Sequence, residues 1–116
     1  MSITMIKTYT RTTTDSRWYE RPTDKVSLVN DWVTAGKMTA TSSRPNPLTL
    51  IINRVYSSQA AYDEWVALPA QQLSLTLQAI HDNANGITWT SVVTDSSTGT
   101  SITTNSSDYS LSLTKS

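Results

Sequence analysis

The sequence contains no cysteine, one histidine and three glycines. The lack of cysteine excludes disulfides, thiolate metal sites and cysteine nucleophiles. A single histidine provides no transition-metal cluster of convincing spacing, and the few glycines form no phosphate-binding loop. The residue types therefore predict no metal, no cofactor and no catalytic residue.

The chain also has no excess of charge, because Lys plus Arg and Asp plus Glu number 9 each. A neutral chain has no long-range field that attracts nucleic acid or an anionic membrane. No run approaches the roughly 20 apolar residues of a membrane span, and the first residues lack the pattern of a signal peptide. We therefore expect neither nucleic acid nor a membrane as partner. The basic and aromatic stretch 11–25 is neutralised by Asp15, Glu20 and Asp24, which disfavours a nucleic-acid site there.

The 116 residues are enough for one domain with a modest core. The hydrophobic fraction of 37% is below the roughly 45–50% usual for globular domains, which predicts that part of the apolar surface is buried against another copy. Ser and Thr make up roughly a third of the chain, a composition more common in strand-rich surfaces and virion proteins than in cytosolic enzymes.

Alternating apolar and polar residues predict four strands, over 3–12, 37–44, 48–55 and 87–94. The third is almost continuously apolar, so we expect it to lie centrally in the sheet with both faces buried. The rigid turn at 45–47 predicts that the second and third strands form an antiparallel pair, the second near an edge.

Two segments show helical spacing. The first begins at Thr23 or Asp24 and ends at Gly36, with an expected inward face of Val26, Leu28, Val29, Trp32 and Val33. The second begins near Ser58, is expected to kink or break at Pro69, and ends at Gly86. Beyond the break, the spacing predicts a buried face of Leu73, Leu77 and Ile80, with Leu75 beside them.

This order predicts an α+β fold, a ferredoxin-like βαββαβ sandwich whose antiparallel sheet carries two helices on one face. Residues 1–99 form this domain, and 100–116 form a C-terminal arm, either extended or a hairpin. The open second face of the sheet must be covered over Trp89, Tyr9 or their neighbours, most simply by a second subunit. Trp18 and Tyr19 either cover the edge of the core or contact a partner. The candidate interface residues are Trp18, Tyr19, Trp89, Tyr109, Leu111 and Leu113.

The run VYSSQAAYDEWVALPAQQL, preceded by an apolar strand, resembles the strand-to-helix segment of the dimeric α/β barrel superfamily, which includes antibiotic-biosynthesis and heme-degrading monooxygenases. The heme-degrading members use a Trp where this chain has Trp65, an Asn on the first strand and a heme-ligating His on the second helix. Here the corresponding segments contain Tyr9-Thr10-Arg11 and Leu73–Thr76, so heme is not expected. His81 lies near a helix end, where a cation is favourable, and is expected to be structural rather than a ligand or base.

The opening ITMIKTYTRT, the segment AGKM and the segment ANGIT are similar to small proteins of tailed bacteriophages, including those that infect cyanobacteria. This resemblance implies a virion-associated protein made in the host cytoplasm. Our first hypothesis is therefore a non-enzymatic virion structural or assembly protein that associates with itself or with a larger virion protein. The alternative is an enzyme or small-molecule binder of the barrel superfamily, with a pocket near Tyr9, Tyr62 and Trp65 between sheet and helices.

Overall fold

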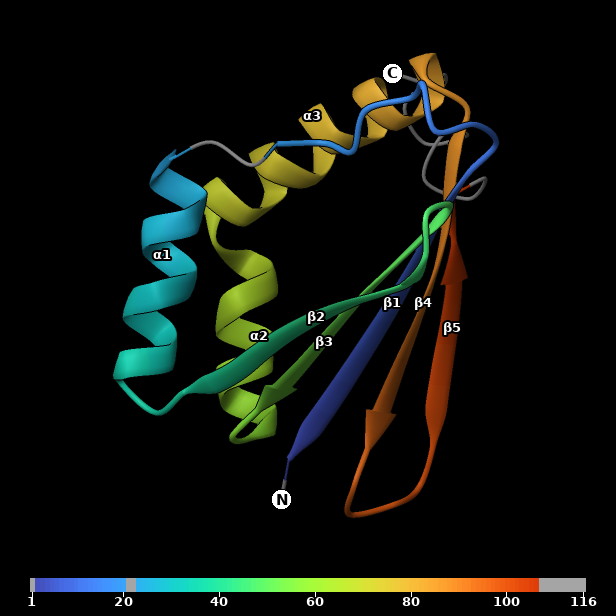
Figure 1. Ribbon diagram of the computed structural model, residues 1–116. Helices are drawn as coiled ribbons and strands as arrows, with labels where there is room; N and C mark the ends of the chain where they lie inside the picture. Colours follow the sequence, from blue (N-terminus) through green and yellow to red (C-terminus); the bar gives the residue numbers. More distant parts are fainter. Residues whose placement is uncertain (1, 21–22, 107–116) are drawn as a thin grey trace, which may run out of the picture.

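The computed structural model describes residues 2–20 and 23–106 and has an α+β fold, a five-stranded antiparallel sheet with three helices. Figure 1 shows the helices on one face of the sheet. In chain order the elements are β1 (Ile3–Arg11), α1 (Thr23–Thr34), β2 (Met38–Asn46), β3 (Thr49–Tyr56), α2 (Gln59–Ala67), α3 (Pro69–Ala84), β4 (Ile87–Asp95) and β5 (Ser101–Asn105).

The strands lie in the order β2-β3-β1-β4-β5, which is compatible with a ferredoxin-like α+β fold. The expected edge position of β2 and its antiparallel pairing with β3 are confirmed. The prediction that residues 48–55 form a central strand buried on both faces is wrong. The middle strand is β1, and most β3 side chains are only half-buried, because the helices cover one face of the sheet.

The chain continues from β4 through a turn into β5, which pairs antiparallel with β4 as a hairpin. The expected domain boundary at residue 99 therefore falls within this turn, and residues 101–105 belong to the sheet. The rest of the expected arm, including Tyr109, Leu111 and Leu113, lies outside the described residues.

The expected break at Pro69 is confirmed, so the structure has three helices where the sequence pattern predicted two. Ser58 caps α2, with its Oγ accepting a hydrogen bond from the Ala61 amide at 3.1 Å. Leu68 is extended, and Pro69 occupies the first turn of α3, where its missing N–H costs nothing. The break lets α2 and α3 cross the sheet in different directions (Figure 1).

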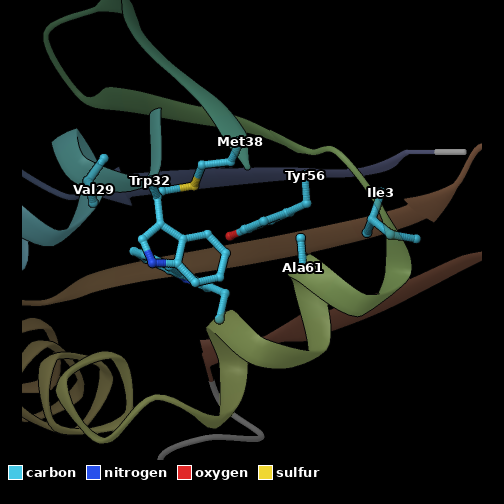
Figure 2. Close-up of a cluster of buried hydrophobic side chains, with 7 residues drawn as sticks. Ile3, Val29, Trp32, Met38, Tyr56 and Ala61 are labelled. Atoms are coloured by element: carbon cyan, nitrogen blue, oxygen red, sulfur yellow. The ribbon is translucent and has the colours of Figure 1, made fainter. Parts of the chain in front are cut away.

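The main core lies between α1, α2 and one end of the sheet. It consists of Ile3, Val29, Trp32, Met38, Tyr56, Ala61 and Trp65. Figure 2 shows Trp32, Met38, Tyr56 and Ala61 converging from α1, β2, β3 and α2. The Trp32 and Trp65 rings meet edge to face with centroids 5.0 Å apart, an arrangement favoured by their quadrupoles. The expected burial of both tryptophans is confirmed.

The predicted inward faces of two helices are partly wrong. In α1, Val29 and Trp32 are buried as expected, but Val26 and Val33 are exposed. In α3, Leu73 and Ile80 are 60% and 57% exposed and Leu77 is also exposed. The side of α3 that faces the sheet instead buries Gln71, Ser74, Ala79 and Asp82. This helix therefore presents a largely polar side to the interior, because it borders a cavity rather than the apolar core.

Candidate functional site

A cavity of about 420 Å³ lies between the helix-bearing face of the sheet and the helices α2 and α3. Its floor is formed by alternate residues of β1, β3 and β4, since side chains on one face of a strand recur every second position. These are Met5, Lys7 and Tyr9, then Leu50, Ile52, Arg54 and Tyr56, then Trp89, Ser91 and Val93. Its roof includes Tyr62 and Trp65 from α2 and Gln71, Ser74 and Gln78 from α3.

The lining of this cavity contains four cationic side chains, Lys7, Lys25, Arg44 and Arg54. No carboxylate of residues 2–20 or 23–106 takes part in the lining. Three of the cations are almost completely buried, with exposed fractions of 7% for Lys7, 4% for Lys25 and 7% for Arg54. Because buried charges are costly unless they are paired, this excess of positive charge on a neutral chain requires an explanation.

Lys7 projects from the middle strand toward two aromatic rings. Its Nζ lies 4.1 Å from the ring centroid of Trp89 and 5.1 Å from that of Tyr9. Within the described part of the chain it forms no hydrogen bond or ion pair. The Lys7 pKa is lowered from 10.5 to about 8, chiefly by burial and secondly by the nearby Arg54 guanidinium, while Asp82 partly offsets both.

The other two buried cations surround Trp65. Lys25 donates a hydrogen bond from Nζ to Gln71 Oε1, and its Nζ lies 5.4 Å from the Trp65 ring centroid. The Arg54 guanidinium lies 5.5 Å from the same ring. Arg54 Nε and Trp65 Nε1 are buried without a hydrogen-bond partner in the described structure, which is costly for donors. This part of the wall is therefore rich in donors and poor in acceptors.

Two tyrosines extend the same wall. Burial raises the pKa of Tyr56, while the charge and hydrogen bond of Arg54 act in the opposite direction. Burial and the neighbouring Asp63 carboxylate raise the pKa of Tyr62. Their rings pack edge to face with centroids 5.2 Å apart. Both hydroxyls therefore stay protonated at neutral pH.

The buried acid of the described residues is Asp82, at the end of α3. Its Oδ1 lies 3.1 Å from His81 Nδ1, and its Oδ2 has no hydrogen-bond partner there. Burial raises the Asp82 pKa, whereas the His81 hydrogen bond and the charges of His81 and Lys7 lower it. His81 lies in the last turn of α3, as expected, with its ring 5.6 Å from that of Tyr19.

The structure brings the three predicted pocket residues, Tyr9, Tyr62 and Trp65, into the lining of this one cavity. Trp18 and Tyr19 also line it, and Trp18 packs against the buried cluster of Tyr9, Ile87 and Trp89. The prediction that Tyr9 and Trp89 lie on the open face and need a partner to cover them is wrong. Both are buried on the helix-bearing side, because residues of the same parity as Lys7 point there.

The open face of the sheet carries other residues. Ile6 is 41% exposed, and its register partners are Asn53 on β3 and Val92 on β4. The neighbouring positions on this face include Thr8 and Ile51, which are paired with each other. This face is therefore a small apolar patch within a threonine-rich surface, and the predicted interface residue Trp89 lies on the opposite, helix-bearing side.

Sequence reasoning did not identify Lys7, Lys25, Arg54 and Gln71 as site residues. Two of them could have been found from the alternation of the strands. Lys7 lies on the same face of its strand as Met5, and Arg54 lies on the same face as Tyr56, among residues that are mostly apolar. A charged residue at such a position indicates a buried charge.

No group of three His, Asp or Glu residues within 2–20 and 23–106 is placed to hold a metal ion. In the same ranges, no helix has both the length and the apolar character needed to cross a membrane. A scan against protein-family models matched no family, and searches of curated proteins and of solved structures gave no match to this chain.

Proposed function

We propose that the protein binds a small anionic organic molecule in the cavity between its sheet and helices. The observation that carries this proposal is the lining, which combines four cationic side chains and several aromatic rings with no carboxylate from the described residues. An anion supplies the compensating charge, and an apolar or aromatic body fills the space between Tyr9, Tyr62 and Trp89. The volume of about 420 Å³ lies within the range of roughly 300–1,000 Å³ for small-molecule sites.

Arg54 is the residue best suited to hold the anionic group. A guanidinium presents a planar set of donors that matches a carboxylate, and Arg54 Nε has no hydrogen-bond partner in the described structure. Lys25 Nζ also lies near the Trp65 ring, 5.4 Å from its centroid, and adds a second positive charge. Because the site is buried, this attraction is screened less than it is at the surface.

The test compares benzoate with benzamide, which has the same shape and no charge. Binding is measured by calorimetry and by the fluorescence of Trp65 and Trp89, which line the cavity. We expect benzoate to bind and benzamide to bind at least about tenfold more weakly, a difference of roughly 1.4 kcal/mol. Arg54→Gln should remove this preference.

Arg17→Gln is the matched control, because it removes the same charge from an exposed residue that does not line the cavity. It should leave benzoate binding unchanged. Equal weakening by both substitutions, or equal affinity for benzoate and benzamide, would contradict the proposal. Circular dichroism of each variant separates loss of binding from loss of fold.

A ferredoxin-like topology is in keeping with a binding site between the sheet and the helices. We propose that β1, α1, β2, β3, the α2–α3 pair and β4 form the βαββαβ sandwich and that β5 extends the sheet at one edge. The order β2-β3-β1-β4 and the antiparallel pairs are compatible with it. The similarity to the dimeric α/β barrel superfamily stays a prediction, and a pocket between sheet and helices is in keeping with it.

A second proposed function is the structural one, a virion or assembly protein that associates with itself or with a larger virion protein. The open sheet face around Ile6 favours it, because exposed apolar residues on a sheet are suited to contact another protein. The two proposals are compatible, since the cavity and the open face lie on opposite sides of the sheet.

A further inference from the structure

We propose that Lys7 reacts with the carbonyl group of a carboxylate-bearing aldehyde or ketone held in the cavity and forms an imine with it. This inference rests on the proposed anion-binding function and names the ligand class and the chemistry of the same site. Anion binding alone gives Lys7 no specific role.

The positions of Lys7 and Arg54 allow one small molecule to contact both. Lys7 lies opposite Ile52, and Arg54 lies two residues further along β3 on the same face of the sheet. Diagonal positions of this kind are about 7–8 Å apart, and both side chains line the cavity. A carboxylate held by the guanidinium therefore places an adjacent carbonyl carbon within reach of Lys7 Nζ.

The surroundings of Lys7 favour the neutral amine that the reaction needs. Burial and the Arg54 charge lower its pKa to about 8, so about a tenth of the side chain is neutral at pH 7, roughly 300-fold more than for an unperturbed lysine. The charged groups that act on its pKa are Arg54 from β3 and Asp82 from α3, and Lys25 from α1 lines the same cavity. The Trp89 and Tyr9 rings attract the ammonium form, an effect of about 1–2 kcal/mol that burial opposes.

In the reaction, the lone pair of neutral Lys7 Nζ attacks the carbonyl carbon, and a C–N bond forms. The electrons of the C=O π bond move to oxygen, which takes a proton from water, while nitrogen releases one, and the product is a carbinolamine. Loss of water then breaks the C–O bond and forms the C=N bond. The balance is amine plus carbonyl giving imine plus water, with no oxidant or reductant.

The other lysines are less suited to this reaction. Lys25 Nζ already donates a hydrogen bond to Gln71 Oε1. Lys37 is largely exposed, pairs with Glu64 at 3.4 Å and does not line the cavity. Lys7 therefore combines burial with an amine that has no hydrogen bond or ion pair to any residue of the described ranges.

The experiment incubates the full chain with 4-carboxybenzaldehyde, followed by cyanoborohydride, which reduces an imine to a stable secondary amine. Peptide mass mapping then locates the adduct. We expect labelling at Lys7 at least about tenfold faster than at Lys37, and a rate that rises from about pH 6 to about pH 8 and then levels off. Benzaldehyde, which lacks the carboxylate, should label Lys7 at least about tenfold more slowly.

Lys7→Arg should remove this adduct, and Lys37→Arg, which changes an exposed lysine outside the cavity lining, should retain it. Labelling spread evenly over the lysines, or equal rates with benzaldehyde, overturns the inference. If benzoate binds in an Arg54-dependent manner and Lys7 is not labelled, imine formation is wrong while the proposed function stands. If benzoate does not bind and Lys7 is not labelled, both are wrong. Because the site of labelling is mapped on the unsubstituted chain, the result does not depend on the folding of any variant.

Discussion

Lys7 occupies a position at which an apolar residue would stabilise the fold better. Its neighbours on the same face of β1 are Met5 and Tyr9, and the residue is 7% exposed without an ion pair in the described structure. A buried cation in such surroundings lowers the free energy of unfolding. Residues that are unfavourable for folding and line a cavity are typical of functional sites.

Replacing Lys7 with Met should therefore raise the free energy of unfolding, by about 1–3 kcal/mol, and abolish labelling by the aldehyde. Because the folded pKa of about 8 lies below the ordinary lysine value of 10.5, the unfolded chain binds more protons than the folded chain between these two pH values. The stability of the unsubstituted protein should thus rise with pH from about 8.

Above about pH 10 the raised pKa values of Tyr56 and Tyr62 act in the opposite direction, because the unfolded tyrosines ionise first. Urea unfolding across this range measures both effects. In Lys7→Met, the rise that begins near pH 8 should be absent. An unchanged pH profile, or a Lys7→Met variant less stable than the parent, would show that Lys7 is well accommodated as a cation.

At the scale of a single residue, sequence reasoning predicted the aromatic part of the site and missed its charges. A pocket near Tyr9, Tyr62 and Trp65 was expected only as what the resemblance to the dimeric α/β barrel superfamily implies. Lys7 and Arg54 were placed in alternating strands, but they were not predicted to lie on the buried face of the sheet. Gln71 was not identified because its burial depends on the direction in which α3 crosses the sheet.

Among the elements, α3 departs most from its sequence pattern. Leu73, Leu77 and Ile80 repeat at helical spacing, which normally marks the buried side. The structure exposes all three and turns Gln71, Ser74 and Asp82 toward the sheet. The periodicity identified the helix correctly but assigned it the wrong face, because a polar cavity requires polar residues and the apolar side is left outside.

Substitutions in α3 and α2 should distinguish exposed apolar residues from a buried core residue. Leu73→Ser and Ile80→Ser should each change the free energy of unfolding by about 0.5 kcal/mol or less, because both side chains are mainly exposed. Trp65→Ala, in contrast, removes a side chain that is 1% exposed and should cost roughly 3–5 kcal/mol. Thermal unfolding of the three variants tests this. A large loss in the α3 variants would mean that Leu73 and Ile80 are buried in solution.

Local signals predicted most of the element boundaries. The β1 and β4 alternations, the Ser58 cap and the break at Pro69 depend on short-range chemistry, and all are present. The order of strands was expected only by analogy with a split βαβ arrangement. The extension of the sheet by β5 was left open as an arm or hairpin, because five residues with a single apolar side chain, Ile102, carry little information about whether they pair.

For the whole molecule, we expect the open sheet face to be the surface through which chains associate. We predict a homo-oligomer or a complex with a partner, because Ile6 is exposed at the centre of this face and the chain has few core residues. Ile6→Lys should dissociate the assembly while leaving the fold intact, as judged by sedimentation and circular dichroism. A stable interface requires burial of about 1,200–2,000 Å² in total, so one central charge should be disruptive.

Ile102→Lys provides the control, since Ile102 is 70% exposed on the edge strand β5 rather than on the open face. It should leave the sedimentation coefficient unchanged. Sedimentation of the unsubstituted protein as a stable monomer at micromolar concentration would contradict the prediction.

The central position of β1 also governs how the chain folds during synthesis. Among the described strands, β1 precedes its partners β3 and β4, whose residues 49–56 and 87–95 are made later. One side of β1 can pair once β3 has been made, but its other side stays without a sheet partner until β4 has been translated. Contacts of such long sequence separation slow folding, and the unpaired side of β1 is open to pairing with other nascent chains in the meantime. The sheet order thus leaves one side of the middle strand exposed for longer than the β2–β3 hairpin beside it.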